Sequence, residues 1–435
     1  MPLALTGMLQ QLFNAADVAV VGRFVGKEAM AAVGSNAPIT GLLINLFIGV
    51  SIGANVVISR FTGQRNFAKV RQAAHTAVVL AVVCGLIIAT VGQVIAAPMV
   101  HLLGVPETIA PLSIKYLRIY FGGMPVIMLY NFQSAIFKSQ GDTRTPLICL
   151  AISGVVNVGL NVFFVVACGM DVDGVALATV LSNLLSSALL FRFLLRTDKP
   201  VRITVKDLRI DGEILKMILR IGIPSGLHGI AFSVSNLAVQ SAVNSLGADV
   251  IAASSASFNI EIFCFFILNS FGQALVTFIG QNHGAGNRER CDRIVRQTAV
   301  LNIITTMTAA LLILVFARHL LGLFNKDPSV IEYGYTRLAM MMPFEFGNAT
   351  METFSGALKG YGRAIVPALA TFGGVCTTRI IWVYTVFAQK PSLRRLMAVY
   401  PVSWAIACVV LLVAYLVIRK RVWAEHLRRT AEQTD

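Results

Sequence analysis

The chain has 435 residues, of which 56% are hydrophobic and 13% are charged, and its mean hydropathy is +0.74. Ordinary soluble proteins carry about 25% charged residues, so the composition excludes a typical globular enzyme. The formal net charge of +15 does not indicate a nucleic-acid-binding protein. Membrane proteins concentrate Lys and Arg in their cytoplasmic loops, and the sequence has no basic module with interleaved aromatic residues.

The apolar residues occur in long blocks. These blocks predict membrane-spanning helices, because about 20 apolar residues cross roughly 30 Å of hydrocarbon. The alternating pattern of a transmembrane barrel is absent, so we expect an all-α integral membrane protein. Twelve spans are predicted, and they lie near residues 2–22, 34–58, 76–98, 110–137, 145–168, 174–195, 217–243, 250–280, 297–322, 332–358, 364–388 and 398–418.

The distribution of Lys and Arg predicts how these spans are oriented. With both termini in the cytoplasm, the cytoplasmic connections and the C-terminal tail hold 25 of these residues, and the rest of the chain holds 11. Positive charge is concentrated on the cytoplasmic side of membrane proteins. We therefore expect a multi-pass protein of the plasma membrane with both termini in the cytoplasm, and we expect it to be a monomer.

A polar stretch at 196–213 divides the spans into two halves of six, and the halves repeat at an offset of 221 residues. FKSQGDTRTP at 137–146 aligns with LKGYGRAIVP at 358–367, and GQRN at 63–66 aligns with GAGN at 284–287. Because each half has an even number of spans, both insert the same way round and form an internal parallel repeat. The predicted parts are an N-terminal lobe at 1–196, a cytoplasmic linker at 197–214, a C-terminal lobe at 215–420 and a cytoplasmic tail at 421–435.

Transporters built from such a repeat bind their substrate between the two halves, and access alternates as one half rocks against the other. Several segments of this chain resemble the multidrug and toxic compound extrusion family. They are LFNAADVAVVGRFVGKEAMAAVG at 12–34, KSQGDTRTP at 138–146, GQNHGAGN at 280–287 and LKGYGR at 358–363. The resemblance covers essentially the whole chain. It implies a twelve-helix, two-lobed antiporter that exports small organic molecules, often cationic, in exchange for H+ or Na+.

The sequence predicts neither catalysis nor a bound cofactor. Its seven cysteines include no CxxC pair, and it has no HExxH or Walker A motif. We therefore expect a protein that is not an enzyme and that needs no cofactor beyond its coupling ion, H+ or Na+. ATP-driven transport is not encoded in the chain.

Polar residues in spans 1 and 4 are candidates for a transport site. Gln10, Asn14 and Asp17 are spaced so that they share one helical face. That face is expected to point toward the bundle interior, since an ionisable group facing lipid costs several kcal/mol. A hydrogen bond between helices is the alternative role. Asn131 and Gln133 of span 4 are predicted to line the central cavity.

The family resemblance implies a cation or proton site in the N-terminal lobe, and the matching residues are Asp17, Asn157, Asn161 and Thr179. The family commonly has Asp where this chain has Asn161, which leaves one carboxylate in place of two. Amide and hydroxyl oxygens with one carboxylate can still bind Na+. A buried carboxylate can instead take up a proton, because burial disfavours its charged form. The sequence therefore leaves open whether H+ or Na+ is the coupling ion.

The C-terminal lobe has its own ionisable residues within the spans. Glu261, Glu345, Glu352 and Arg379 form either an acidic site, which suits a cationic or amphipathic organic cargo, or a buried ion pair between Arg379 and one of the glutamates. His228 is expected to be hydrogen-bonded packing.

Three other functions were weighed. A flippase for lipid-linked saccharides shares the two-lobed plan, but it would line its cavity with basic residues, and only Arg379, with Arg118 or Arg337, is a candidate. An intramembrane hydrolase would need a nucleophile and base or a metal cluster, which the sequence does not show. A membrane scaffold without transport does not explain the ionisable residues in the spans.

Overall fold

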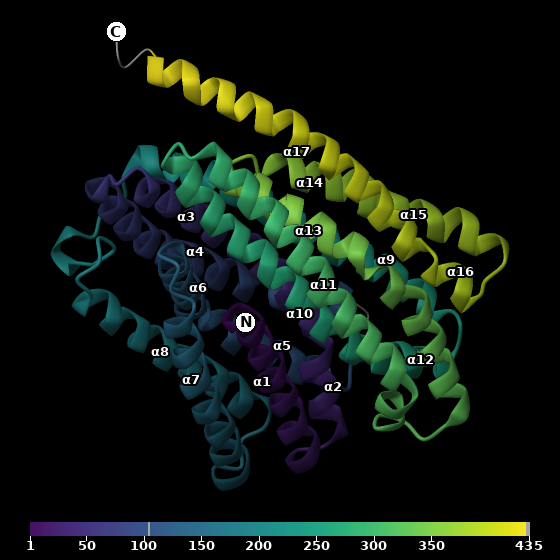
Figure 1. Cartoon of the computed structure of the whole chain (residues 1–435). Coiled ribbons are helices and arrows are strands. Elements are labelled where there is room, and N and C mark those ends of the chain that lie inside the picture. Colours follow the sequence, from purple (N-terminus) through teal and green to yellow (C-terminus); the bar gives the residue numbers. More distant parts are fainter. Residues whose placement is uncertain (103–104, 432–435) are drawn as a thin grey trace. The chain divides into compact units, whose positions relative to one another are not determined.

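The computed structural model describes residues 1–102 and 105–431, and every regular element in these ranges is helical (Figure 1). The chain divides into two compact units, one of residues 2–226 and one from Leu227 onward together with Met1. The division falls inside a single helix, α9 (Gly212–Asn244), which contains Pro224.

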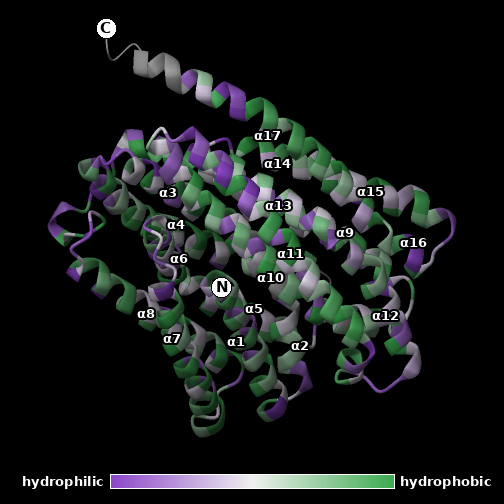
Figure 2. Ribbon diagram, viewed as in Figure 1, coloured by the Kyte–Doolittle hydropathy of each residue, from purple (hydrophilic) through white to green (hydrophobic). Residues whose placement is uncertain are grey.

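Nine helices of the described chain are long and apolar enough to cross a membrane. Figure 2 shows hydrophobic residues dominating along these helices. Besides α9 they are α3 (Ala37–Gly63), α4 (Phe67–Leu102), α7 (Arg144–Val162) continued by η1 (Phe163–Ala167), α8 (Val172–Arg196), α10 (Ala248–Gly284), α11 (Arg288–Gly322), the run Ile365–Phe387 and α17 (Val399–Ala431).

The other three predicted spans are more polar or interrupted. The first is α1 (Pro2–Phe24), the fourth consists of α5 (Ala110–Gly122) and α6 (Met124–Ser139), and the tenth consists of α12 (Pro328–Met341), η3 (Met342–Phe344) and α13 (Glu345–Gly360). Both interruptions occur at a proline, Pro125 and Pro343, since proline lacks the backbone donor that would continue a helix and disfavours helical geometry in the residue before it. The remaining short helices are α2 (Lys27–Ser35), η2 (Val205–Asp207) and α16 (Leu393–Met397).

The segment predicted as a linker, 197–214, is docked on α4 in the first unit. The backbone N–H of Thr204 donates to His75 Nε2 at 3.0 Å, and Arg71 donates to Asp207 at 2.9 Å. His75 is buried, whereas the ion pair of Arg71 with Asp207 is half-exposed. The connection between the halves is therefore an ordered part of the first unit over this stretch.

Close backbone contact joins α10 to α13 in the second unit. A Cβ atom added to Gly356 would lie 2.4 Å from the carbonyl oxygen of Gly272. Small residues allow membrane helices to approach this closely, and the resulting van der Waals contact stabilises the pair. This contact fixes the position of α13, which carries Glu345 and Glu352.

Replacing Gly356 with Ala is expected to destabilise the second unit by about 1–3 kcal/mol, because the new methyl group collides with backbone that cannot rotate away. The measurement is the apparent Tm of the purified protein in detergent. Gly347→Ala in the same helix is the matched control, since its nearest neighbour would be Trp404 Cβ at 3.7 Å, an ordinary contact. Equal Tm values for the two variants would contradict the prediction.

Removing the docking contacts of the linker, with Arg71→Ala and His75→Ala together, is expected to expose the linker to protease. Each lost hydrogen bond costs about 1 kcal/mol, and the exposed ion pair contributes less. Trypsin cleavage between Lys199 and Arg209 should become several-fold faster, as measured by mass spectrometry of the fragments. Lys69→Ala on the same helix is the control, and it should leave the cleavage rate unchanged.

Candidate functional site

Asp17 lies on α1 and is packed inside the first unit, with 6% of its surface exposed. Gln10 and Asn14, which share its helical face in the sequence, are exposed. Within this unit only Asp17 of the three is buried, and the role of Gln10 and Asn14 as cavity or substrate residues stays a prediction. Gln10 and Asn14 are exposed because α1 packs mainly against α7, so the side of α1 away from α7 is left uncovered by the rest of the unit.

Two residues of α7 face Asp17. Asn157 and Asn161 are one helical turn apart and both are buried, which agrees with their spacing. Gly154, one turn earlier, gives α1 room, since a Cβ atom there would lie 1.8 Å from the ring of Phe13. The missing side chain lets α1 approach α7 one turn before Asp17.

These side chains form one hydrogen-bonded network with α8. Asn161 Nδ2 donates to Asp17 Oδ1 at 2.5 Å and to Asn157 Oδ1 at 3.3 Å. Thr179 Oγ1 of α8 donates to Asp17 Oδ2 at 3.2 Å and lies 3.0 Å from the carbonyl oxygen of Val175. The structure thus brings together all four residues that the family resemblance implied.

The network offers oxygen atoms around a single carboxylate. No Lys, Arg or His whose side chain the structure describes forms an ion pair with Asp17. Asn161 Oδ1 is enclosed and has no hydrogen-bond partner, which costs about 1–3 kcal/mol for a buried polar group. Carboxylate and amide oxygens are the ligands that hard cations prefer. The arrangement can therefore hold a cation, or a proton that supplies the missing donor.

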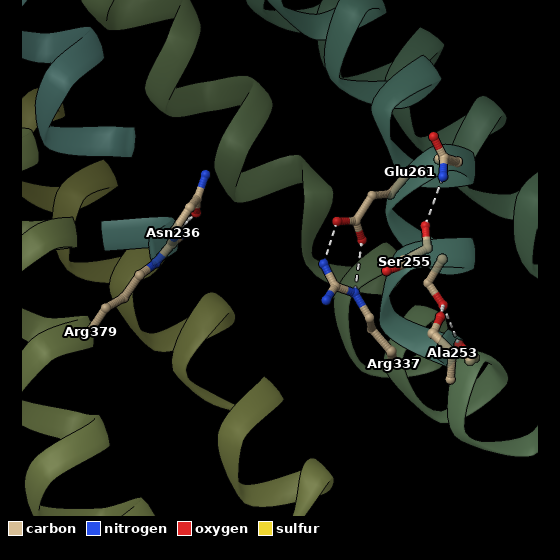
Figure 3. Close-up of polar contacts among 9 residues, drawn as sticks. Asn236, Ala253, Ser255, Glu261, Arg337 and Arg379 are labelled. Carbon is tan, nitrogen blue, oxygen red and sulfur yellow. Dashed lines mark hydrogen bonds and ion pairs between the residues drawn. The ribbon is translucent and has the colours of Figure 1, made fainter. Parts of the chain in front are cut away.

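In the second unit, Glu261 of α10 forms a two-pronged ion pair with Arg337 of α12. Arg337 donates from Nη2 to Oε1 at 2.5 Å and from Nε to Oε2 at 3.4 Å, and Figure 3 shows both contacts. Both side chains are largely buried. The pair joins α10 to α12 and has no net charge, so Glu261 is not a free acid.

The two glutamates of α13 have different partners. Glu352 Oε1 lies 3.7 Å from Nε2 of His228 on α9, and the other ring nitrogen of His228 is 2.9 Å from the hydroxyl of Thr371. His228 is hydrogen-bonded packing, as expected, but it is also the partner of a predicted site residue. Glu345 is buried and accepts a hydrogen bond from Asn348 at 3.0 Å.

The ion pair considered for Arg379 is not formed. No carboxylate in the described chain lies within 4.0 Å of its guanidinium. Glu261 and Glu352 contact Arg337 and His228, and Glu345 acts on Arg379 only from farther away. Arg379 is 1% exposed, and it donates to Asn236 Oδ1 at 2.7 Å (Figure 3) and to Ser403 Oγ at 3.3 Å. It is therefore a buried cation surrounded by neutral acceptors.

The two polar residues of α6 occupy different environments. Gln133 is fully buried and accepts a hydrogen bond from Ser187 of α8 at 3.2 Å. Asn131 is half-buried and donates to the carbonyl of Ile127 in its own helix at 2.8 Å. Gln133 thus lies in the packed interior of the first unit, where it joins α6 to α8, and not on an open cavity wall.

Comparison with known proteins identifies the family. The MatE profile matches residues 2–163 and matches residues 224–385 a second time. The chain belongs to the MatE family. It is 27% identical to the probable multidrug resistance protein YoeA of Bacillus subtilis, over 97% of this chain and 92% of that protein. It is 28% identical to the probable multidrug resistance protein NorM of Thermotoga maritima, over 86% and 81% of the two chains.

A solved structure of a MATE protein in a bent conformation has the same fold. It superimposes with a TM-score of 0.88 at 22% identity and covers 99% of this chain and 95% of that one. MatE proteins are multi-pass membrane transporters, not enzymes, and have twelve transmembrane helices in two lobes. The nine apolar helices, with α1, α5–α6 and α12–α13, supply the twelve spans here. The predicted family and fold class are confirmed.

Some residues near the Asp17 network were not predicted from the sequence. Tyr116 and Tyr120 of α5 interact electrostatically with Asp17, and their rings stack with centroids 5.9 Å apart. Their spacing of four residues in YLRIY is the signal that could have placed them on one face of span 4. Arg337 was considered as a cavity cation, yet its pairing with Glu261 depends on how α10 packs against α12.

Replacing Asn161 with Asp would restore the second carboxylate of the family pattern. Two carboxylates in direct contact repel unless a proton or a cation lies between them. We expect the variant to bind Na+ about tenfold more tightly than the wild type, which corresponds to about 1.4 kcal/mol. The measurement is the Na+-dependent rise in apparent Tm of purified protein at constant ionic strength.

Asn183→Asp, one helical turn beyond Thr179 on α8, is the control for this variant. It adds the same charge to the same lobe without touching Asp17. If Asn161→Asp and Asn183→Asp respond equally to Na+, position 161 does not contribute to the cation site.

Proposed function

We propose that this MatE chain is a secondary active exporter, which exchanges organic compounds for H+ or Na+ through alternating access of its two lobes. Family membership supports multidrug efflux as the general activity. The observation that carries the ion-coupled mechanism is the Asp17 network, in which a buried carboxylate has amide and hydroxyl partners and no opposite charge.

A proton at Asp17 would be accommodated by the same residues in a second arrangement. When Asp17 is ionised, it accepts hydrogen bonds from Asn161 and Thr179. When it is protonated, its hydroxyl can donate to Asn161 Oδ1 once that amide has turned over, since amide orientation follows the hydrogen-bond network. Protonation would then satisfy the enclosed oxygen that lacks a donor.

Sodium would use the same oxygens directly. The carboxylate of Asp17, the amide oxygens of Asn157 and Asn161 and the hydroxyl of Thr179 lie on three helices, α1, α7 and α8. An ion shared by these groups would hold α1 to the other two helices more tightly. Because an ion shifts a conformational equilibrium only through different affinities for the two states, α1 is the element through which occupancy would act.

The cargo is an organic compound, and we expect it to be cationic or amphipathic. Glu345 is the acid of α13 that has no cation partner within 4.0 Å in the described chain, and it would attract a positive group. A saccharide flippase is less well supported, because Arg337 is neutralised by Glu261 and Arg118 is exposed. Of the three basic residues considered, only Arg379 is buried without an acid.

Replacing Asp17 with Asn is expected to abolish ion-coupled efflux. The amide keeps the shape of the side chain but can neither take up a proton nor supply a charge to a cation, so the driving gradient no longer acts on α1. The measurement is export from proteoliposomes under separately imposed H+ and Na+ gradients, with ethidium as the transported dye. The gradient that drives the wild type identifies the coupling ion.

Glu107→Gln is the matched control, since it neutralises an acid of the same lobe outside the network. It should transport like the wild type. Gradient-driven efflux by Asp17→Asn at the wild-type rate would refute the role of Asp17, provided that the variant elutes as a folded protein on size exclusion.

A further inference from the structure

Arg379 occupies an unusual stretch of helix in the second unit. It lies on α15 (Thr378–Trp382), a short α-helical segment between two π-helical segments, η4 (Phe372–Thr377) and η5 (Val383–Phe387). π-helical segments are rare, and they occur frequently at functional sites. The backbone on both sides of Arg379 thus departs from the regular helix that the rest of a span would adopt.

The carboxylates of Glu261 and Glu345 act on the charge of Arg379 only from beyond 4.0 Å, so its guanidinium has no ion-pair partner in the described chain. Its side chain is 1% exposed, and its three hydrogen bonds go to the neutral oxygens of Asn236, Ser235 and Ser403. A buried charge without an opposite partner costs several kcal/mol. In membrane segments such residues mark binding or transport sites.

Two of its five N–H donors are unused. Nε donates to Ser403, and Nη1 donates to Asn236 and Ser235, while Nη2 has no acceptor in the described chain. Nη2 is also not fully enclosed, because it is not among the enclosed polar atoms that lack a hydrogen-bond partner. The neighbouring nitrogen, Nη1, donates to Asn236, and Asn236 is itself exposed. An acceptor that approached beside Asn236 would meet this unused donor.

Aromatic rings form the walls of this position. The guanidinium carbon of Arg379 lies 4.3 Å from the ring centroid of Tyr400 and 6.0 Å from that of Phe232. The guanidinium of Arg337 lies 6.0 Å from the same Tyr400 ring, and its charge is matched by Glu261. The position therefore combines a guanidinium that has no acid within 4.0 Å with aromatic surface for an organic body.

We propose that Arg379, with Asn236 and Tyr400, binds a carboxylate group of an organic compound that the protein exports. A carboxylate suits this position because it presents oxygens to a planar guanidinium and forms short, charge-assisted hydrogen bonds. Its single negative charge equals the single positive charge of the guanidinium, whereas a phosphate dianion would leave an excess. The proposal rests on the proposed export function, and it is compatible with a second, cationic group of the same compound near Glu345.

The test compares two probes with the same aromatic body, 2-naphthoate and the neutral 2-naphthamide. Their binding to the purified full-length protein in lipid nanodiscs is measured by titration calorimetry. We expect the wild type to bind naphthoate at least about tenfold more tightly than naphthamide, and Arg379→Gln to lose that preference while its naphthamide affinity is unchanged. Arg379→Lys keeps the positive charge but loses the planar guanidinium with its paired donors, so it should retain part of the preference for naphthoate.

A second variant keeps the test decisive if Arg379→Gln does not fold. Asn236→Asp places a carboxylate on the exposed residue that already contacts Nη1 at 2.7 Å, so the protein supplies its own counterion. Naphthoate binding should be lost, and the apparent Tm should rise. Asn259→Asp, the same change at another exposed asparagine of this unit, is the control and should bind naphthoate like the wild type.

The outcomes separate this proposal from the proposed export function, because binding is measured without transport. Equal affinity of the wild type for both probes, no binding of naphthoate, or undiminished naphthoate binding by Asn236→Asp would each overturn the carboxylate site. Naphthoate binding that depends on Arg379, in a protein that fails to transport under either gradient, would support the site and count against ion-coupled export.

Discussion

An ionisable side chain in apolar surroundings needs an opposite charge or hydrogen-bond partners, and this requirement determines the polar contacts of both units. Glu261 is matched by a full opposite charge on Arg337, and Glu352 by the imidazole of His228. Asp17 and Arg379 have only neutral hydrogen-bond partners in the described chain. Acids held by opposite charges join helices, whereas groups held by dipoles keep an uncompensated charge that a mobile ion or a ligand can neutralise.

The positions of these groups depend on how closely the helices approach. In lipid there is no hydrophobic driving force between helices, so their association depends on small residues that allow close van der Waals packing. Gly154 lets the ring of Phe13 lie against α7, and Gly272 and Gly356 bring the backbones of α10 and α13 together. The geometry around Asp17 and Glu352 is thus set by residues with no side-chain chemistry of their own.

Hydrophobic blocks and charge positions predicted the helical membrane fold, and the family motifs predicted the quartet around Asp17. Periodicity predicts which residues share a helical face, but it does not say which neighbour covers that face, so it did not predict that Asp17 would be buried while Gln10 and Asn14 are exposed. Ion pairs between distant segments depend on packing and side-chain reach. The sequence therefore left the partner of Arg379 open, and it did not predict that Arg337 would pair with Glu261 or that Gln133 would be fully buried.

The docked segment at 197–214 has a mechanical consequence for the covalent connection between the units. Because it is held on α4, it cannot act as a slack tether, and the chain crosses the division at residues 226 and 227 as helix α9. Pro224 lies two residues before that point and removes one hydrogen bond of the helix. The connection is thus helical where it crosses the division, and Pro224 is a weakened point of that helix.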